Sequence, residues 1–150
     1  MTDRELMQAA IALAREAATD GEVPVGAVVT RNGEIVSVGR NRREKDKNAL
    51  AHAEIEAIDR ACKALGGWRL WECELFVTLE PCPMCAGAII NSRIKRVVFG
   101  AYDPKAGSCE SVNNLFAFPY NHSPEVEGGF MQDECALLLK QFFAELRRTK

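Results

Sequence analysis

The sequence has little of what marks a membrane protein, a secreted scaffold or a disordered tail. No apolar run in its 150 residues approaches the roughly 20 residues that a transmembrane helix needs. Residues 1–6 lack a positive segment followed by an apolar stretch, so we expect no signal peptide. Low-complexity tracts and internal repeats are also missing. These absences predict a single domain over residues 1–150, located in the cytoplasm with no membrane partner.

Net charge is also scarce, because the formal charge at pH 7 is only −2. A chain with this balance does not indicate nucleic-acid binding by composition alone. Its basic residues are nevertheless clustered along the sequence: Arg40, Arg42, Arg43, Lys45 and Lys47, then Arg93, Lys95 and Arg96, and finally Arg147, Arg148 and Lys150. Such runs are commonly solvated surface, but clusters that converge in space can hold phosphates. Charge therefore neither supports nor excludes an RNA substrate.

The six cysteines are expected to be ligands or buried thiols, since no export signal points to a disulfide framework. Cys82 and Cys85 have the Cys-x-x-Cys spacing, which alone would also fit a thioredoxin-like redox pair or half of a structural zinc site. No second Cys-x-x-Cys completes a structural site. The remaining cysteines are scattered and fit small buried hydrophobic residues: Cys62, Cys73, Cys109 and Cys135.

Two short stretches carry the chemistry, His52-Ala53-Glu54 and Pro81-Cys82-Pro83-Met84-Cys85. Together they form His-x-Glu followed by Pro-Cys-x-x-Cys, the signature of zinc nucleobase deaminases. One imidazole and two thiolates supply three ligands to a tetrahedral Zn²⁺, and the position left for water is typical of a catalytic site. Glu54 can lie beside that water without binding the metal. The pattern therefore predicts a hydrolytic zinc centre.

Hydrophobic periodicity predicts a three-layer α/β/α domain in which a mixed central sheet of about five strands has helices on both faces. Gly26 interrupts the first strand, which indicates either a bulge or the close approach of a ligand. Asn32-Gly33 predicts a tight hairpin turn. We expect helices at 3–19, 51–65, 83–91 and 133–148, strands at 23–30, 34–39, 74–79, 94–101 and near 126, and a long loop at 103–121 with a short helix near 112–116.

The helix pattern also restricts where the two motifs can lie. His52 and Glu54 are two residues apart and do not share a helix face, so they can converge only at the very start of a helix that borders a pocket. Cys82 and Cys85 are three residues apart and can face one point. At a helix N-terminus, free amides and the helix dipole favour their thiolate form, which is the form a metal binds.

Beyond these motifs, the chain resembles the bacterial tRNA-specific adenosine deaminase (TadA) family, within the cytidine deaminase-like zinc deaminases. The resemblance covers essentially the whole chain, and its later blocks lie outside the general deaminase signature. It departs from the common pattern at 108–120 and at 47–50, neither of which contains a zinc ligand. The matching residues are Val23–Val28, Asn41, Ala51–Ile55, Thr78–Ala88, Ser92–Ile94, Arg96–Ala101, Asp103, Lys105, Asn121, His122 and Asp133–Cys135.

This resemblance implies hydrolytic deamination of the wobble adenosine in an arginine tRNA anticodon loop to inosine. It implies a homodimer that binds the tRNA anticodon stem-loop and holds one Zn²⁺ per subunit through His52, Cys82 and Cys85. Glu54 would carry a proton from the zinc-activated water to the base. Asn41 would hydrogen-bond the flipped-out base, although a loop-capping role remains open. Asp103 and Lys105 are further expected substrate contacts.

Two alternative functions remain at this stage. A free-base or nucleoside deaminase, guanine deaminase in particular, would use the same zinc chemistry without RNA. A non-catalytic zinc subunit that binds RNA would need no acid–base carboxylate, so Glu54 argues against it. His122 has no motif around it, and we expect it to be structural or a substrate contact.

Overall fold

The computed structural model describes residues 1–149. In chain order the elements are α1 (Asp3–Thr19), β1 (Gly26–Arg31), β2 (Glu34–Arg40), α2 (Ala53–Leu65), β3 (Cys73–Leu79), α3 (Pro83–Ser92), β4 (Arg96–Ala101), the 3₁₀ helix η1 (Leu115–Ala117), β5 (Glu125–Glu127) and α4 (Gln132–Arg148). Within this range, no helix has both the length and the apolar character needed to span a bilayer.

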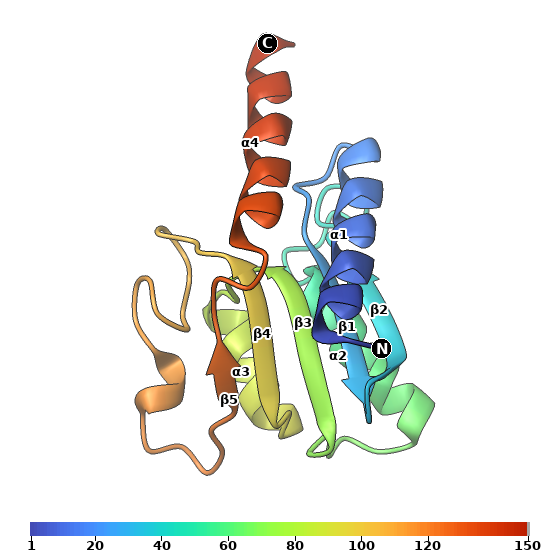
Figure 1. Cartoon of the computed structure of the whole chain (residues 1–150), viewed down its shortest axis with the longest axis vertical. Coiled ribbons are helices and arrows are strands. Elements are labelled where there is room, and N and C mark those ends of the chain that lie inside the picture. Colours follow the sequence, from blue (N-terminus) through green and yellow to red (C-terminus); the bar gives the residue numbers. More distant parts are fainter. Residues whose placement is uncertain (150) are drawn as a thin grey trace.

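The five strands form one mixed sheet in the order β2-β1-β3-β4-β5 (Figure 1). β1 is antiparallel to both of its neighbours, whereas β3, β4 and β5 are mutually parallel. β2, β3 and β4 consequently run in the same direction and end at the same edge of the sheet. Residues that follow these three strands are thereby brought together.

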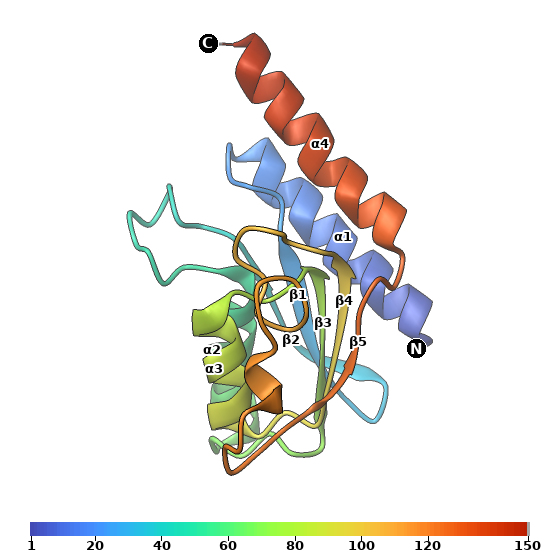
Figure 2. The same cartoon turned by 90° about the vertical axis from the view of Figure 1, so that its left-hand side faces the viewer.

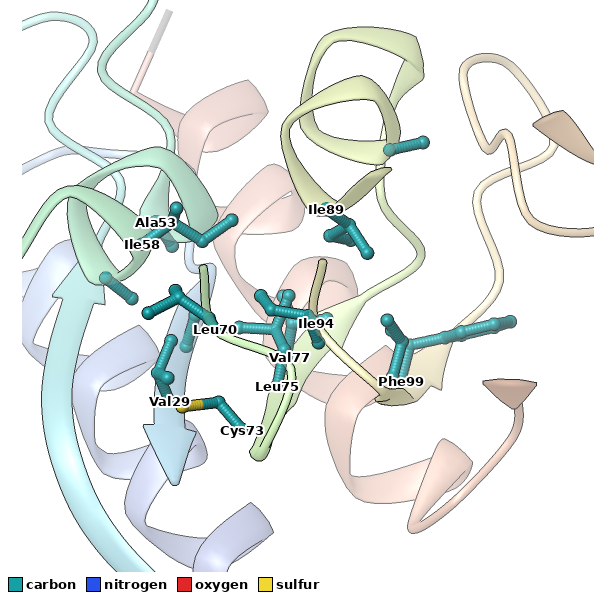
Figure 3. Packing of buried hydrophobic residues seen from close by; sticks show 14 of the residues in the cluster. Val29, Ala53, Ile58, Leu70, Cys73, Leu75, Val77, Ile89, Ile94 and Phe99 are labelled. Atoms are coloured by element: carbon teal, nitrogen blue, oxygen red, sulfur yellow. The ribbon is translucent and has the colours of Figure 1, made fainter. Parts of the chain in front are cut away.

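The sheet lies between two helical layers, with α1 and α4 on one face and α2 and α3 on the other (Figure 2). Side chains of β3 alternate between the two resulting cores, as the two-residue period of a strand requires. Leu75 and Val77 pack toward α2 and α3, among the residues of Figure 3, while Phe76 packs toward α1. The expected three-layer α/β/α fold with a mixed five-stranded sheet is confirmed.

The N-terminal end of the first strand differs from the sequence prediction. β1 begins at Gly26, because Pro24 has no N–H to donate and the amide of Val25 instead donates to the carbonyl of Val23 at 2.9 Å, which forms a turn. The bulge expected at Gly26 is not there. A Cβ there would overlap the carbonyl oxygen of Ala10, so glycine allows α1 to approach the sheet. The register irregularity lies further along, between Val29 and Thr30.

Two other elements are close to their predicted positions. The Asn32-Gly33 turn joins β1 and β2 with φ angles of 54° and 76°, the positive values that this hairpin type needs. The short helix of the long loop is three residues of 3₁₀ helix at Leu115–Ala117, slightly later than expected. Asn114 caps it by accepting from the amide of Phe116 at 3.1 Å. Local turn chemistry therefore explains both features.

Candidate active site

The two motifs lie at the sheet edge where β2, β3 and β4 end, each at the N-terminus of a helix. His52 is the N-cap of α2, and Glu54 is in the first turn of that helix. Cys82 is the N-cap of α3, where Pro83 occupies the first helical turn and Cys85 follows within it. Proline fits this position because the first helical residues have no intrahelical acceptor for their N–H groups. Both helix starts therefore aim their free amides at one place.

His52, Cys82 and Cys85 form a cluster whose ligand atoms all lie within 4.8 Å of one another. The Nδ1 atom of His52 is 3.6 Å from the Sγ atom of Cys82 and 3.6 Å from that of Cys85. No other group of three or more potential ligand residues was found in the part of the chain that the structure describes.

The cluster fits zinc by donor chemistry and by spacing. One imidazole with two thiolates is a ligand set of catalytic zinc sites. A tetrahedral zinc with a Zn–S distance of about 2.3 Å and a Zn–N distance of about 2.0 Å separates sulfur from nitrogen by about 3.5 Å. The separations from His52 to both sulfurs match this value. The three predicted ligands are therefore together in a geometry consistent with one zinc ion per subunit.

Glu54 is a buried carboxylate beside these ligands, with only 4 % of its surface exposed. Burial is the main reason that the pKa of Glu54 is raised to about 7, and the nearby Cys82 adds to the increase. Burying a carboxylate is unfavourable for folding, so such a residue is expected where a ligand or a reaction requires it. Its position and its cost to stability both indicate a functional group.

The pKa values of the two cysteines are shifted in opposite directions, because a hydrogen bond with Cys82 and burial raise the pKa of Cys85. A hydrogen bond from Cys85 lowers the pKa of Cys82 to about 4, and contact with His52 contributes to the same effect. The pKa of His52 is raised, chiefly by its hydrogen bond with Cys82. A thiolate at Cys82 is the state that a metal binds.

A cavity of about 210 Å³ opens beside the cluster. This is below the roughly 300–1,000 Å³ of pockets that enclose drug-sized ligands, so the cavity suits a single base-sized group. Its wall combines apolar residues with side chains from all three strand ends: Val23, Val25, Asn41, Arg43, His52, Ala53, Glu54, Leu79, Glu80, Cys82, Asp103 and Ala106. The geometry can admit a flat, polar ring to Glu54.

The expected substrate contacts lie at different depths. Asn41 lines the cavity but also caps its loop, donating from Nδ2 to the carbonyl of Val23 at 3.2 Å and accepting at Oδ1 from the amide of Arg43 at 3.1 Å. Its second amide proton and one lone pair remain available. Asp103 lines the cavity and accepts from the amide of Lys105 at 3.1 Å. Lys105 is exposed outside the cavity wall.

Sequence reasoning missed Glu80 as a residue that organises the site. Glu80 is 2 % exposed and lines the cavity, and its carboxylate accepts from the amides of Asp103, Cys109, Glu110 and Ser111 and from the Ser111 hydroxyl. Burial raises the pKa of Glu80, but the hydrogen bonds, led by those from Ser111, outweigh it and hold that pKa below its usual value. No local sequence signal marks this role, because the partners of Glu80 are 23 to 31 residues further along the chain.

Glu22 organises the second loop at the cavity in the same way. It is 2 % exposed, and its carboxylate accepts from the amides of Glu44 at 3.0 Å and Lys45 at 2.7 Å. Two buried carboxylates therefore hold the two loops that border the cavity, 41–48 and 103–111.

The first basic cluster is only partly available to an anionic ligand. Arg40 is paired with Asp20 at 2.8 Å, and Arg42 is paired with Glu56 at 2.7 Å. Arg43 borders the cavity and is exposed. Runs of basic residues in sequence therefore overstate the positive surface here.

His122 makes a structural contact. Its Nε2 atom lies 2.7 Å from the carbonyl oxygen of Ile94, which joins the end of the long loop to the segment before β4. It is outside both the cavity wall and the three-residue ligand cluster.

Comparison with known proteins gives close matches along the whole chain. The model of the MafB19-like deaminase family matches residues 1–147. A tRNA-specific adenosine deaminase of Bacillus subtilis (strain 168) is 51 % identical over 152 aligned residues, which cover 100 % of this chain and 94 % of the relative.

Solved structures resemble this chain to different degrees. A structure from a study of A-to-I editing by tRNA:A34 deaminases at the wobble position of transfer RNA superposes with a TM-score of 0.88 at 43 % identity, covering 91 % of this chain and 99 % of the other. A guanine deaminase of Nitrosomonas europaea gives a TM-score of 0.80 at 26 % identity, covering 95 % and 85 %. The fold is shared by both, whereas the sequence is more similar to the first.

Proposed function

Because the chain belongs to the MafB19-like deaminases, and among them to the tRNA-specific adenosine deaminases, we propose that it converts the wobble adenosine of a tRNA anticodon loop to inosine by hydrolysis. The substrate includes the arginine isoacceptor. The observation that carries the proposal is a zinc-type ligand cluster and a buried carboxylate at one base-sized cavity.

His52, Cys82 and Cys85 would hold the zinc ion. When bound, zinc lowers the pKa of water toward neutrality and so supplies a nucleophile at ordinary pH. The protein contributes the fixed ligand set, because His52 and Cys82 are helix N-caps whose positions are set by α2 and α3. With only three protein ligands, a bound ion would still be able to take up water, as is typical of catalytic zinc sites.

Glu54 moves the protons of the reaction. Its carboxylate takes a proton from the attacking water and gives it to ring atom N1 while the water oxygen adds to C6. It then transfers the second water proton to the amino nitrogen, so that ammonia leaves and the C6 carbonyl of inosine remains. Enclosure of Glu54 excludes bulk water, which would otherwise compete for these protons.

The cavity wall positions the base. Asn41 has hydrogen-bonding capacity left after capping its loop, and it hydrogen-bonds the edge of the flipped-out adenine. A wobble adenosine is in a single-stranded loop, where a base can be extruded at low cost and read individually. Asp103 and Lys105, at the end of β4, contact the neighbouring nucleotides.

The working protein is a cytoplasmic homodimer in which each subunit is one domain of residues 1–150. The outer surface of α2 and α3 supports a dimer, because it is apolar and only half buried at Ile55, Met84 and Ala88. A Cβ at Gly87 on α3 would meet nothing within 4 Å, so the surface is open to a partner. All six cysteines are unpaired, as is usual in a reducing compartment.

Side-by-side turnover assays test the proposal. The zinc-loaded protein is offered an anticodon stem-loop with adenosine at the wobble position and, separately, free guanine, cytosine and adenosine. We expect inosine only in the RNA. Turnover of guanine with inert RNA would keep the zinc chemistry but assign the chain to guanine deamination, and no turnover of any substrate would leave a non-catalytic zinc protein.

A further inference from the structure

The buried carboxylate of Glu80 anchors the 103–111 loop. All of its hydrogen bonds are with residues of that loop. Its Oε1 atom accepts from the amide of Asp103 at 3.0 Å and from the hydroxyl of Ser111. Its Oε2 atom accepts from the amides of Cys109 at 3.1 Å, Glu110 at 2.8 Å and Ser111 at 2.9 Å. One side chain thus satisfies donors at both ends of the loop.

This anchor continues to the residues expected to contact the substrate. Once Glu80 fixes the amide of Asp103, the Oδ1 atom of Asp103 accepts from the amides of Lys105 at 3.1 Å and Ala106 at 3.2 Å. The amide of Gly107 closes the turn on the carbonyl of Asp103 at 2.8 Å. The hydrogen bonds therefore form a chain from Glu80 to the turn that displays Asp103 and Lys105.

The sequence leaves space for this anchor at Gly107. A Cβ at that position would overlap the carboxylate of Glu80. The φ angle of Gly107 is not in the positive region, so the steric contact is what requires glycine here. The carboxylate of Glu80 therefore fits in this position only because residue 107 is a glycine.

From this arrangement we propose that Glu80 is a positioning residue for RNA binding, which holds the 103–111 loop so that Asp103 and Lys105 meet the nucleotides around the target adenosine. The inference rests on the proposed tRNA deamination. Glu80 acts on how tightly RNA is held, through the loop, while His52, Cys82, Cys85 and Glu54 perform the chemistry.

Glu80→Gln is the sharpest variant. Glutamine has nearly the same size, but its NH₂ group must face either the donors at Oε1 or those at Oε2, so one set of hydrogen bonds is removed. Ser111→Ala removes a single hydroxyl donor, and Gly107→Ala disturbs the contact by volume alone. Ser123→Ala is a matched control, since it removes one hydroxyl bond, to the carbonyl of Phe116, elsewhere in the same long connection.

Four quantities are measured on the zinc-loaded variants: KM and kcat for the adenosine stem-loop, zinc content, and amide hydrogen exchange. For Glu80→Gln we expect KM to rise about tenfold or more with kcat within about threefold, since unsatisfied buried donors loosen the loop but not the zinc centre. Exchange should accelerate at the amides of Asp103, Cys109, Glu110 and Ser111, and zinc content should be unchanged. Ser111→Ala should move KM about threefold in the same direction, and Ser123→Ala should leave it unchanged.

Several results would overturn the inference. Faster exchange with KM within about twofold of wild type would make the anchor purely structural. A loss of zinc that parallels the loss of activity would assign Glu80 to the metal site. If Glu80→Gln does not fold, Ser111→Ala still decides the matter through the same ratio of KM to kcat. Failure of the proposed function is distinguishable, because the wild-type protein would then form no inosine in the stem-loop.

Discussion

Glu54 is a buried carboxylate that forms no salt bridge within the described residues. Its carboxylate is buried in the first turn of α2, where removing charge from water is unfavourable. Residues of this kind are retained when a reaction needs them. Replacement of Glu54 should therefore lower activity without lowering stability.

Glu54→Ala should lower turnover of the stem-loop by about 10²–10⁴-fold, the usual contribution of a positioned acid–base group. Zinc content should be unchanged, because Glu54 is outside the ligand cluster. The free energy of unfolding should not fall, since a buried carboxylate is removed. Turnover, metal analysis and denaturant unfolding measure the three effects. A near-normal rate would remove Glu54 from the mechanism.

Replacement of Cys82 should have a different effect, because Cys82 is a predicted zinc ligand and also a helix N-cap without a capping hydrogen bond of its own. Cys82→Ser replaces a soft thiolate by a hydroxyl that binds zinc weakly, so zinc should dissociate and turnover should fall with it. Serine is a better N-cap than cysteine, so α3 itself should persist. Metal analysis and far-ultraviolet circular dichroism check both effects, and unchanged zinc stoichiometry would contradict the ligand assignment.

At the scale of elements, two close approaches set the position of the site. Gly39 on β2 permits the first turn of α2 to lie directly against the sheet, as Gly26 does for α1. A Cβ at Gly39 would overlap the carbonyl oxygen of Ala53 and come within 2.7 Å of the amide nitrogen of Ala57. Since α2 begins with the residues of the first motif, this contact places His52 and Glu54.

Gly39→Ala should therefore move the start of α2 and lower both stability and activity. Overpacking of this kind costs about 1–3 kcal/mol, and turnover should fall further than stability alone explains. Gly67→Ala is the matched control, because its Cβ would meet nothing within 4 Å and its φ is not positive. Denaturant unfolding and stem-loop turnover measure the pair. Equal behaviour of the two variants would mean that α2 tolerates displacement.

Elements and ligands could be predicted from sequence where the signal is local. The clustering of His52, Cys82 and Cys85 followed from two short motifs at helix starts, and the hairpin followed from Asn32-Gly33. The role of Glu80 could not be predicted, because its partners are 23 to 31 residues away in a loop without periodicity. The bulge expected at Gly26 was wrong for the same reason, since the contact that requires glycine there is with a separate helix.

At the scale of the whole molecule, net charge does not show which basic residues are free to bind an anion. Arg40 and Arg42 are paired with carboxylates, whereas Arg43 and Lys45 are exposed on the 41–48 loop beside the cavity. Among the described residues, neither Arg43 nor Lys45 has a carboxylate oxygen within 4.0 Å of a side-chain nitrogen. The RNA-facing charge should therefore come from Arg43 and Lys45.

Combined replacement of Arg43 and Lys45 by alanine should weaken stem-loop binding and flatten its salt dependence. Each phosphate that the protein no longer neutralises should reduce the slope of log K against log salt by about 0.7. Replacement of Arg4 and Arg15 by alanine makes the same change in charge on α1, on the other face of the sheet, and should leave the slope unchanged. Titrations at several salt concentrations measure both. Equal slopes for the two double variants would mean that the loop is only solvated surface.

The outer surface of α3 also leads to a prediction about dimer formation. Gly87 is on the open side of α3, next to half-buried apolar residues that a second subunit would cover. Gly87→Arg introduces a charge there, yet arginine is a better helix former than glycine by nearly 1 kcal/mol, so the single subunit should remain folded.

We expect the wild-type protein to sediment as a dimer and Gly87→Arg as a zinc-loaded monomer, because a charge buried in an apolar interface is strongly unfavourable. Gln8 is exposed on α1, so Gln8→Arg adds the same charge to the other face of the sheet and should stay dimeric. A Gly87→Arg variant that remains a dimer would move the interface away from α3. A monomeric wild-type protein would instead place the entire RNA contact on one subunit, where the loops held by Glu22 and Glu80 are the available surfaces.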